Sequence, residues 1–504
     1  MTKEEIQKIY DRMKSLSLKE IGREKCHHSL ACLRAAGYIA YSFGLKYCDD
    51  DIEGQLVSLS TQIKRRDNVS GGQKNGMRCV FLDGLSEFRG GLTVQYLRAI
   101  KEAGWETLYV SDQDLGQRHR ISLVKELKSN PQLRYVQVPK RTSGQGRCQF
   151  MYDAIMDFAP DFVIVHIPPY DSYAATVCYA LPSTIKKYMV NYTDHSFLLG
   201  TGCMDYSLEF RSKGASISKV FRHIEETQMF MLPYYAFSED EKPYQGLPKI
   251  CDGKVVIFTG GNYWKIIDEE DTYFKLSKRI LEECPNAVIV LAGRGNDEVV
   301  RKAVERQQPG ERFVVLGWRQ DIGALFEHSD IYLSTYPYPG GLMGQFAARA
   351  GKPILAYDPQ NKRGTESLTC QTKMVDISIT EMDDFIAETK RLVNDTDYRK
   401  QKGDELRDSV LSIGQFNRML REVVESQKPT GLPIEIDEKV QEPSEEYIQN
   451  NIKTHGDGHS CKSTLVSYLG TYSLSVLPWS YIVTYYKTRI PQWWSVAVKR
   501  CIKK

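Results

Sequence analysis

The sequence predicts an α/β fold with two Rossmann-like domains, each a parallel sheet with helices on both faces. Apolar runs that fit buried strands alternate with helical segments from residue 77 to about residue 426, and the alternation restarts near residue 254. Several of the runs end at glycine-rich turns. The chain has 504 residues, about three times a usual domain length, so two main domains with extensions are expected.

The composition is that of a globular protein, and the charge and cysteine pattern exclude some classes of binding partner and site. A net charge of +3 is too small to indicate nucleic-acid binding. The 12 cysteines form no CxxC pair and no ligand-like spacing, which predicts reduced thiols in a cytoplasmic protein. The first 20 residues are charged, and no apolar run reaches 18 residues, so we expect neither a secretory signal nor a transmembrane helix.

Residues 1–75 are expected to form a helical N-terminal extension, because apolar residues recur there at helical spacing before a polar, glycine-containing stretch. Its expected role is packing or oligomer contact. The first Rossmann-like domain is expected over residues 76–245. Its predicted strands are 79–82, 107–110, 133–138, 162–166, 187–191 and 228–232, and its predicted helices are 92–103 and 148–158.

The second Rossmann-like domain is expected over residues 246–426. Its predicted strands are 254–258, 287–291, 313–316, 331–333 and 354–357, with helices at 273–284, 322–327 and 342–350. The carboxyl ends of parallel strands gather at one edge of a sheet, so we expect a ligand to bind at the loops there, in a cleft between the two domains.

One stretch of the second domain, residues 330–353, reads as strand, glycine loop and helix. In the loop YPYPGG, two prolines remove amide donors and Gly340 and Gly341 permit positive φ, so neither helix nor strand can continue. The helix that follows is ended by Gly351-Lys352-Pro353. Such a unit directs backbone N–H groups at an anion; the alternative is an ordinary strand-to-helix connection.

These residues resemble glycosyltransferases of the GT-B fold, over roughly residues 77–426. The loop YPYPGG followed by GKP is similar to the donor loop of inverting O-linked N-acetylglucosamine transferases and related bacterial protein glycosyltransferases, which carry PYNGGT and a later G-x-P turn. The segment YTDHSFLLG, residues 192–200, with Asp205 and Arg211, is similar to a histidine-containing loop of the bacterial members. The resemblance implies that the second domain binds a nucleotide sugar and the first meets the acceptor.

The chain departs from both mechanistic classes of GT-B enzyme at the helix after this loop. Many retaining members place two glutamates, separated by seven residues, where this chain has Pro339 and Ala347. The inverting relatives have an aspartate that contacts the ribose where this chain has Phe346, and Gln345 or Glu366 are the candidates to replace it.

A leaving diphosphate needs its charge stabilised by a metal or by fixed donors and cations. The two runs that match a metal-binding DxD motif, at 49–51 and 112–114, lie outside the proposed donor domain, so we expect no metal and no cofactor, only a nucleotide-sugar co-substrate, most simply a UDP-sugar. The expected donor-binding residues are the amides of the helix start, a guanidinium, a glycine turn and residues of two loops. They are Gly340, Gly341, Leu342 and Met343; Arg294; Gly260 and Gly261; and Tyr338 and Trp318.

Each of these has a structural alternative: Arg294 as a solvated surface residue, Gly260-Gly261 as a plain turn, and Trp318 as a core-capping residue rather than a stacking face for the base.

An inverting transfer also needs a base that takes the acceptor proton. His195, which follows a predicted strand beside Asp194, is the candidate, and His166 is its rival. Because neighbours on a strand point to opposite faces, Asp194 need not touch His195. Gly90 and Gly91 resemble the glycine turn through which GT-B enzymes admit a substrate close to the backbone. Either histidine has a purely structural alternative role.

The C-terminal residues change in character. Residues 427–458 are rich in proline and acids and predict an exposed linker. In residues 459–504 aromatic and apolar residues are interleaved with lysine and arginine without any acid, which predicts short helices, broken by Pro478 and Pro491, on an anionic membrane surface. The alternative is that this face packs on the protein or on a second copy.

The sequence and the resemblance therefore predict a cytoplasmic, inverting glycosyltransferase that is peripheral to the inner face of the cell membrane. It is expected to move a sugar to a lipid-linked or cell-surface glycan precursor. A protein O- or N-glycosyltransferase and a non-catalytic GT-B-fold partner of another transferase remain alternatives, and an oligomer remains open. No GxGxxG motif opens either domain, which disfavours an NAD-dependent oxidoreductase.

Overall fold

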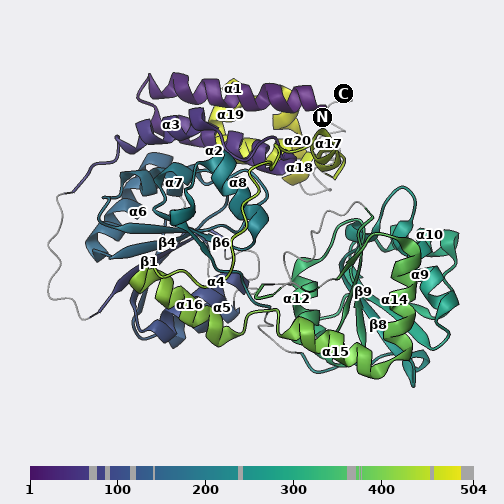
Figure 1. Ribbon diagram of the computed structural model, residues 1–504. Coiled ribbons are helices and arrows are strands. Elements are labelled where there is room, and N and C mark those ends of the chain that lie inside the picture. Colours follow the sequence, from purple (N-terminus) through teal and green to yellow (C-terminus); the bar gives the residue numbers. More distant parts are fainter. Residues whose placement is uncertain are drawn as a thin grey trace, which may run out of the picture. The chain divides into compact units, whose positions relative to one another are not determined.

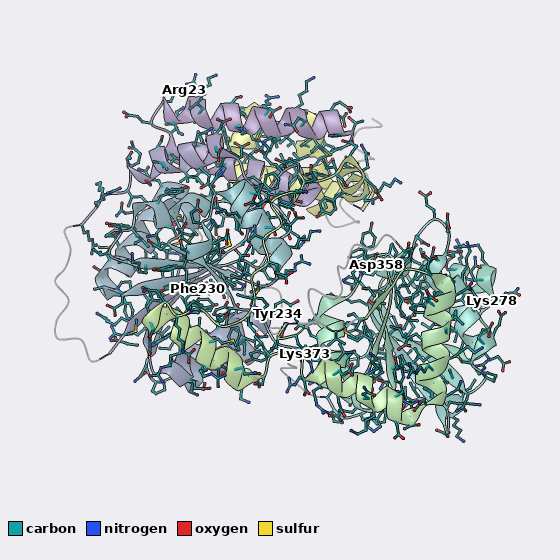
Figure 2. All side chains as sticks on the ribbon, in the orientation of Figure 1. Arg23, Phe230, Tyr234, Lys278, Asp358 and Lys373 are labelled. Carbon is teal, nitrogen blue, oxygen red and sulfur yellow. The ribbon has the colours of Figure 1, made fainter. Side chains whose placement is uncertain are left out.

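The computed structural model divides the chain into two compact units. Unit 1 comprises Met1–Phe230 and Ile434–Lys504, and unit 2 comprises Met231–Pro433; Figure 2 labels Phe230 and Tyr234 on either side of the first boundary. Each unit contains one sheet of parallel strands, which confirms the two predicted Rossmann-like domains. The described residues are 1–66, 76–85, 91–113, 121–139, 142–236, 242–359, 371–373, 375, 377–454 and 459–489.

The sheet of unit 1 has the strand order β3-β2-β1-β4-β5-β6-β7, and the pairings from β3 to β6 are parallel. The middle strands β1 and β4 are mostly apolar and almost wholly buried, because helices cover both faces of the sheet (Figure 1). The strands are β1 Arg78–Asp83, β2 Glu106–Ser111, β3 Leu133–Gln137, β4 Phe162–His166, β5 Lys186–Val190, β6 Tyr206–Glu209 and β7 Met229–Met231.

The N-terminal helices form further layers on unit 1. The helix α2 packs on α6 and α7, and α1 packs on α2, so their apolar faces join one core cluster (Figure 1). The helices of this part are α1 Lys3–Ile21, α2 Cys26–Phe43, α3 Asp50–Ser60, α4 Gly91–Ala103, α5 Ile121–Ser129, α6 Gly144–Phe158, α7 Ser172–Ala180 and α8 Ser212–Arg222.

The C-terminal residues return to unit 1 as short helices, α17 Glu445–Thr454, α18 His459–Leu469, α19 Ser473–Val476 and α20 Trp479–Arg489. The first of these, α17, lies in the segment that was predicted to be a linker. The helix α18 packs on α2 and α20 and buries Leu465 and Val466 in the core, so its apolar residues contact protein. Trp479 and Leu474 remain 71% and 59% exposed. Within the described ranges, no helix combines the length and the apolar character needed to cross a bilayer.

The sheet of unit 2 has the strand order β10-β9-β8-β11-β12-β13, all parallel. Its topological switch point lies between β8 and β11, and in such sheets ligands bind at the loops that follow these two strands. The elements are β8 Val255–Asn262, α9 Thr272–Glu283, β9 Ala287–Arg294, α10 Asp297–Gln307, β10 Phe313–Gly317, α11 Ile322–Glu327, β11 Ile331–Leu333, α12 Gly341–Arg349, β12 Ile354–Tyr357, β13 Ser378–Ile379, α14 Met382–Asn394, α15 Thr396–Arg407 and α16 Ile413–Ser426.

The predicted turn at Gly260-Gly261 is wrong, because β8 continues through both glycines. Gly261 pairs with Gly293, and the next pair brings Arg294 into β9 as its last residue rather than into a loop. A Cβ atom on Gly293 would lie 2.2 Å from the carbonyl oxygen of Gly261. Facing glycines therefore let the two strands approach closely and lengthen the ladder instead of ending it.

Candidate functional site

The start of α12 lies where the loop pattern predicted it. The helix begins at Gly341 with Gly340 as its N-cap, and within the described chain no side chain caps it. Its first N–H groups therefore have no partner inside the helix, and the helix dipole makes this end attractive to an anion. The hydroxyl of Tyr332, buried and without a hydrogen-bond partner among the described residues, lies beside this end: a Cβ on Gly340 would be 3.3 Å from it.

The loops after β8 and β11 meet at the switch point. A Cβ atom on Gly260 would lie 2.4 Å from Cε of Met343, so the first turn of α12 rests directly on the glycines of β8. Gly261 has a φ of 148°, which favours glycine, and its nearest neighbour there is the methyl group of Thr335 at 4.0 Å. Thr335 in turn donates its hydroxyl to the carbonyl oxygen of Tyr338 at 2.6 Å. The structure thus brings four predicted donor residues together.

A cation that sequence reasoning missed lies beside this helix start. Lys265 is in a short 3₁₀ helix, Tyr263–Ile266, directly after β8, and its Nζ donates to the carbonyl oxygen of Pro339 at 3.2 Å. The N–H of Tyr338 points back to the carbonyl oxygen of Lys265 at 3.4 Å. Burial lowers the pKa of Lys265. An anion that binds beside such a partly buried ammonium group stabilises its charged form.

Arg294 and Trp318 form a second group at the same edge of the sheet. The guanidinium of Arg294 lies 5.1 Å from the centroid of the Trp318 ring, and its Nε donates to Oδ1 of Asn262 at 3.2 Å. Trp318 follows β10 and is 47% exposed, so one of its faces carries the cation while much of the ring remains accessible. Beside Lys265, the rings of Trp264 and Tyr338 are 5.2 Å apart.

The position expected to recognise a ribose is apolar in the structure. Phe346 stacks on Phe326 with ring centroids 6.1 Å apart, and Gln345 is buried. Glu366, the other candidate, lies outside the described residues.

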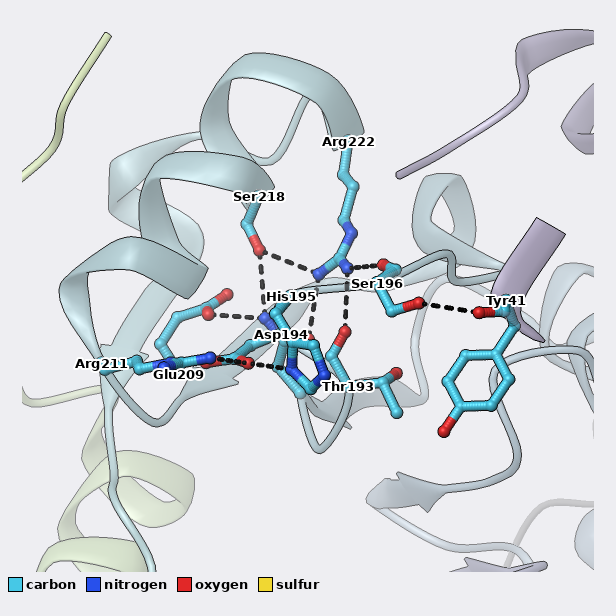
Figure 3. Close-up of polar contacts among 10 residues, drawn as sticks. Tyr41, Thr193, Asp194, His195, Ser196, Glu209, Arg211, Ser218 and Arg222 are labelled. Atoms are coloured by element: carbon cyan, nitrogen blue, oxygen red, sulfur yellow. Dashed lines mark hydrogen bonds and ion pairs between the residues drawn. The ribbon is translucent and has the colours of Figure 1, made fainter. Parts of the chain in front are cut away.

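In unit 1, His195 and Asp194 contact each other, a contact that the sequence left open. The strand β5 ends at Val190, so both residues lie in a turn where neighbouring side chains can meet (Figure 3). Nδ1 of His195 is 3.0 Å from Oδ1 of Asp194, and Arg211 donates to both oxygens of that carboxylate at 2.6 and 2.9 Å. Burial disfavours the charged carboxylate, but the charge of Arg211 and the hydrogen bonds outweigh it and lower the pKa of Asp194 well below its usual range.

The ionised carboxylate fixes what His195 can do. A carboxylate only accepts hydrogen bonds, so Nδ1 of His195 must carry the hydrogen, and Nε2 of the neutral ring is then left to accept a proton. The His195 side chain is 52% exposed, whereas that of Asp194 is 5% exposed. This is the arrangement that a general base requires.

A buried arginine binds the backbone of the turn that carries His195. Arg222 donates to the carbonyl oxygens of Ser196 and Thr193 at 2.6 and 3.2 Å and to the side-chain oxygen of Asn191 at 2.9 Å (Figure 3). Asn191 donates to the buried carboxyl group of Glu209 at 2.6 Å. Burial lowers the pKa of Arg222 and raises that of Glu209. No sequence pattern marked this network.

The remaining predicted residues of unit 1 have other surroundings. His166 is buried, with Nδ1 3.0 Å from Asp83, which also accepts from Thr93 and Tyr109, so its setting is that of a structural histidine. Gly91 begins α4, and Gly90 lies outside the described residues.

The DxD-like runs are engaged in ion pairs. Asp49 accepts from Lys14 and Tyr10, and Asp112 accepts from Arg147 at 2.6 Å, while Asp114 lies outside the described residues. In the part of the chain that the structure describes, no group of three His, Cys, Asp or Glu side chains is placed to hold a metal ion.

Comparison with known proteins identifies similar structures but no similar sequences. No family profile matches the chain, and no curated protein matches it. An O-GlcNAc transferase of Thermobaculum terrenum has a TM-score of 0.50 and 15% identity, covering 83% of each chain. HepE of Anabaena, solved with UDP and glucose, has a TM-score of 0.50 and 13% identity, covering 70% of this chain and 100% of HepE. A glycosyltransferase of Rickettsia africae gives 0.50 and 11%, with 70% and 100% coverage. With its two parallel sheets, this chain has the GT-B fold.

Proposed function

We propose that this chain is a metal-independent, inverting glycosyltransferase that uses a nucleoside diphosphate sugar, most simply a UDP-sugar. The observation that carries the proposal is the uncapped start of α12 with Lys265 beside it, at the switch point of the second sheet. Amides at a helix start and an ammonium group both recognise a diphosphate. The fold supports the proposal, since HepE was solved with UDP bound.

Each group has a role in the proposed reaction. The acceptor oxygen attacks the anomeric carbon while the bond from that carbon to the diphosphate oxygen breaks. The α12 amides and Lys265 stabilise the charge that develops on the leaving diphosphate. Arg294 adds a second cation, and Trp318 offers a stacking face to the nucleobase. Nε2 of His195 takes the acceptor proton.

The proposed acceptor is a lipid-linked or cell-surface glycan precursor, and the proposed location is the cytoplasmic face of the membrane. The exposed Trp479 and Leu474 of the C-terminal helices support it, because an aromatic ring with apolar neighbours suits the depth of lipid headgroups.

Binding of UDP tests the donor site directly. Lys265→Met should weaken the affinity by about 10- to 100-fold, since a hydrogen bond from a charged group contributes about 1.5–3 kcal/mol. Lys254→Met is the matched control, because Lys254 precedes β8 and its Nζ also contacts a proline carbonyl oxygen, that of Pro285 at 3.4 Å. Isothermal titration calorimetry that finds no UDP binding, or equal losses in both variants, would count against the donor site.

Transfer of a radiolabelled sugar tests the chemistry. His195→Ala should abolish transfer while leaving the UDP affinity unchanged, because the substitution removes the base and not the donor contacts. Label in an organic extract would support a lipid-linked acceptor, and label in protein would instead support protein glycosylation. If UDP binds but no UDP-sugar is hydrolysed or transferred, the chain is a non-catalytic partner.

A further inference from the structure

A cavity of about 380 Å³ lies in unit 1 between α1 and the C-terminal helices. Its walls come from α1 on one side and from α18, α19 and the start of α20 on the other, and Figure 1 shows α1 and α19 side by side. None of the residues proposed for sugar transfer lines it. The N-terminal and C-terminal segments of the chain therefore form a site that neither could form alone.

The charged part of this cavity is mainly cationic. Lys8, Arg12 and Lys462 line it, against the single carboxylate of Glu5. Within the described ranges, no salt bridge neutralises any of the three cations, whereas Lys14 on the same helix pairs with Asp49. Three cations that share one cavity with a single carboxylate leave an excess of positive charge, which favours an anionic ligand.

The rest of the lining is apolar. Ile9 contributes from α1, and Val476 and Leu477 from the end of α19. Next to them along the chain, Trp479 and Leu474 are largely exposed, so the apolar surface continues outward from the cavity. Exposed apolar side chains that adjoin a basic site are typical of a surface that meets lipid headgroups.

We propose that this cavity binds an anionic phospholipid of a membrane surface, with the phosphate at Lys8, Arg12 and Lys462 and the first part of an acyl chain on Ile9, Val476 and Leu477. A free phosphate would leave the apolar lining without a partner, and an uncharged lipid would leave three cations without one. The inference is independent of sugar transfer, since it uses none of the transfer residues.

Vesicle binding tests the proposal on the full chain. The protein should bind vesicles of equal parts phosphatidylglycerol and phosphatidylcholine, and it should not bind vesicles of pure phosphatidylcholine. The double variant Lys8→Gln, Arg12→Gln should lower the partition coefficient about 30-fold, because each basic residue near an anionic surface contributes about fivefold. The matched control is Lys125→Gln, Lys128→Gln, which removes two exposed cations from α5, elsewhere in unit 1, and should leave binding unchanged.

A soluble short-chain lipid distinguishes binding in the cavity from attraction to a basic surface. Dihexanoyl phosphatidylglycerol should raise the melting temperature of the protein, and glycerol phosphate or inorganic phosphate at the same concentration should not. Equal losses in the two double variants, no vesicle binding by the unmodified protein, or equal stabilisation by inorganic phosphate would each overturn the proposal. UDP affinity measured on the same samples shows that the variants are folded and keeps this outcome separate from that of the donor site.

Discussion

Replacing Asp194 by asparagine should destabilise unit 1 by about 3 kcal/mol. The carboxylate is almost fully buried and accepts two hydrogen bonds from Arg211, whose side chain is 12% exposed. An amide in its place turns one acceptor into a donor that faces the guanidinium, and it removes the buried negative charge that Arg211 contacts. Breaking a buried ion pair by removing one partner costs about 3–5 kcal/mol, and the partial exposure of Arg211 places this case at the lower end.

Urea denaturation followed by circular dichroism measures the effect. Arg211→Gln and the double variant complete a double-mutant cycle. The losses of unfolding free energy in the two single variants should sum to clearly more than the loss in the double variant, because either single substitution already breaks the ion pair. His195→Ala is the control, since it removes one contact of a half-exposed ring and should cost less than about 1 kcal/mol.

The pH dependence of stability provides a second test of the ion pair between Asp194 and Arg211. The folded-state pKa of Asp194 is lowered, so its stabilisation is fully present above the unfolded pKa of about 4 and is lost as the pH falls toward the folded pKa. The difference between the natural protein and Asp194→Asn should therefore be constant from pH 6 to 8 and shrink below about pH 4. A difference under about 1 kcal/mol at pH 7, or one that grows on acidification, would refute the argument.

Three further predictions follow from other contacts. Arg222→Met should destabilise the protein by about 3–5 kcal/mol in urea denaturation, because it leaves a buried carboxyl group and two carbonyl oxygens without their cation; a loss under about 1 kcal/mol would contradict this. Gly293→Ala should separate β8 from β9 and weaken UDP binding in calorimetry, whereas Gly414→Ala in α16, with open space around its Cβ, should be neutral or stabilise by up to about 1 kcal/mol. UDP binding should take up a proton at alkaline pH, because an anion favours the charged form of Lys265, whose pKa burial lowers; titration in buffers of different ionisation enthalpy would show no uptake if Lys265 does not meet the ligand.

Most strands could be predicted from apolar runs, but two elements show the limit of that signal. The strand β6 was missed because Ser207 and Glu209 are polar, although both are fully buried and hydrogen-bonded to each other at 2.6 Å. The helix α7 was missed because it is buried on nearly all sides and so has no polar face to mark its period. In both cases tertiary contacts, not local patterns, set the burial.

The residues of the candidate site also differ in whether the sequence could predict their positions. The start of α12 could be predicted, because prolines and glycines act locally on the backbone. The contact of Lys265 with Pro339 joins residues 74 positions apart, so it depends on the order of strands in the sheet. The contact of Asp194 with His195 was left open for a simpler reason: the alternation rule was applied beyond Val190, where the strand ends.

The packing of α18 on α2 has a consequence for how the protein is made. The ribosome releases α2 long before α18, and unit 2 is synthesised between them. Until α18 emerges, the surface of α2 that it covers stays open to water, so a nascent or truncated chain presents an apolar patch to chaperones and proteases. Removing residues from 459 onward is therefore expected to cause aggregation, because it uncovers this surface of α2.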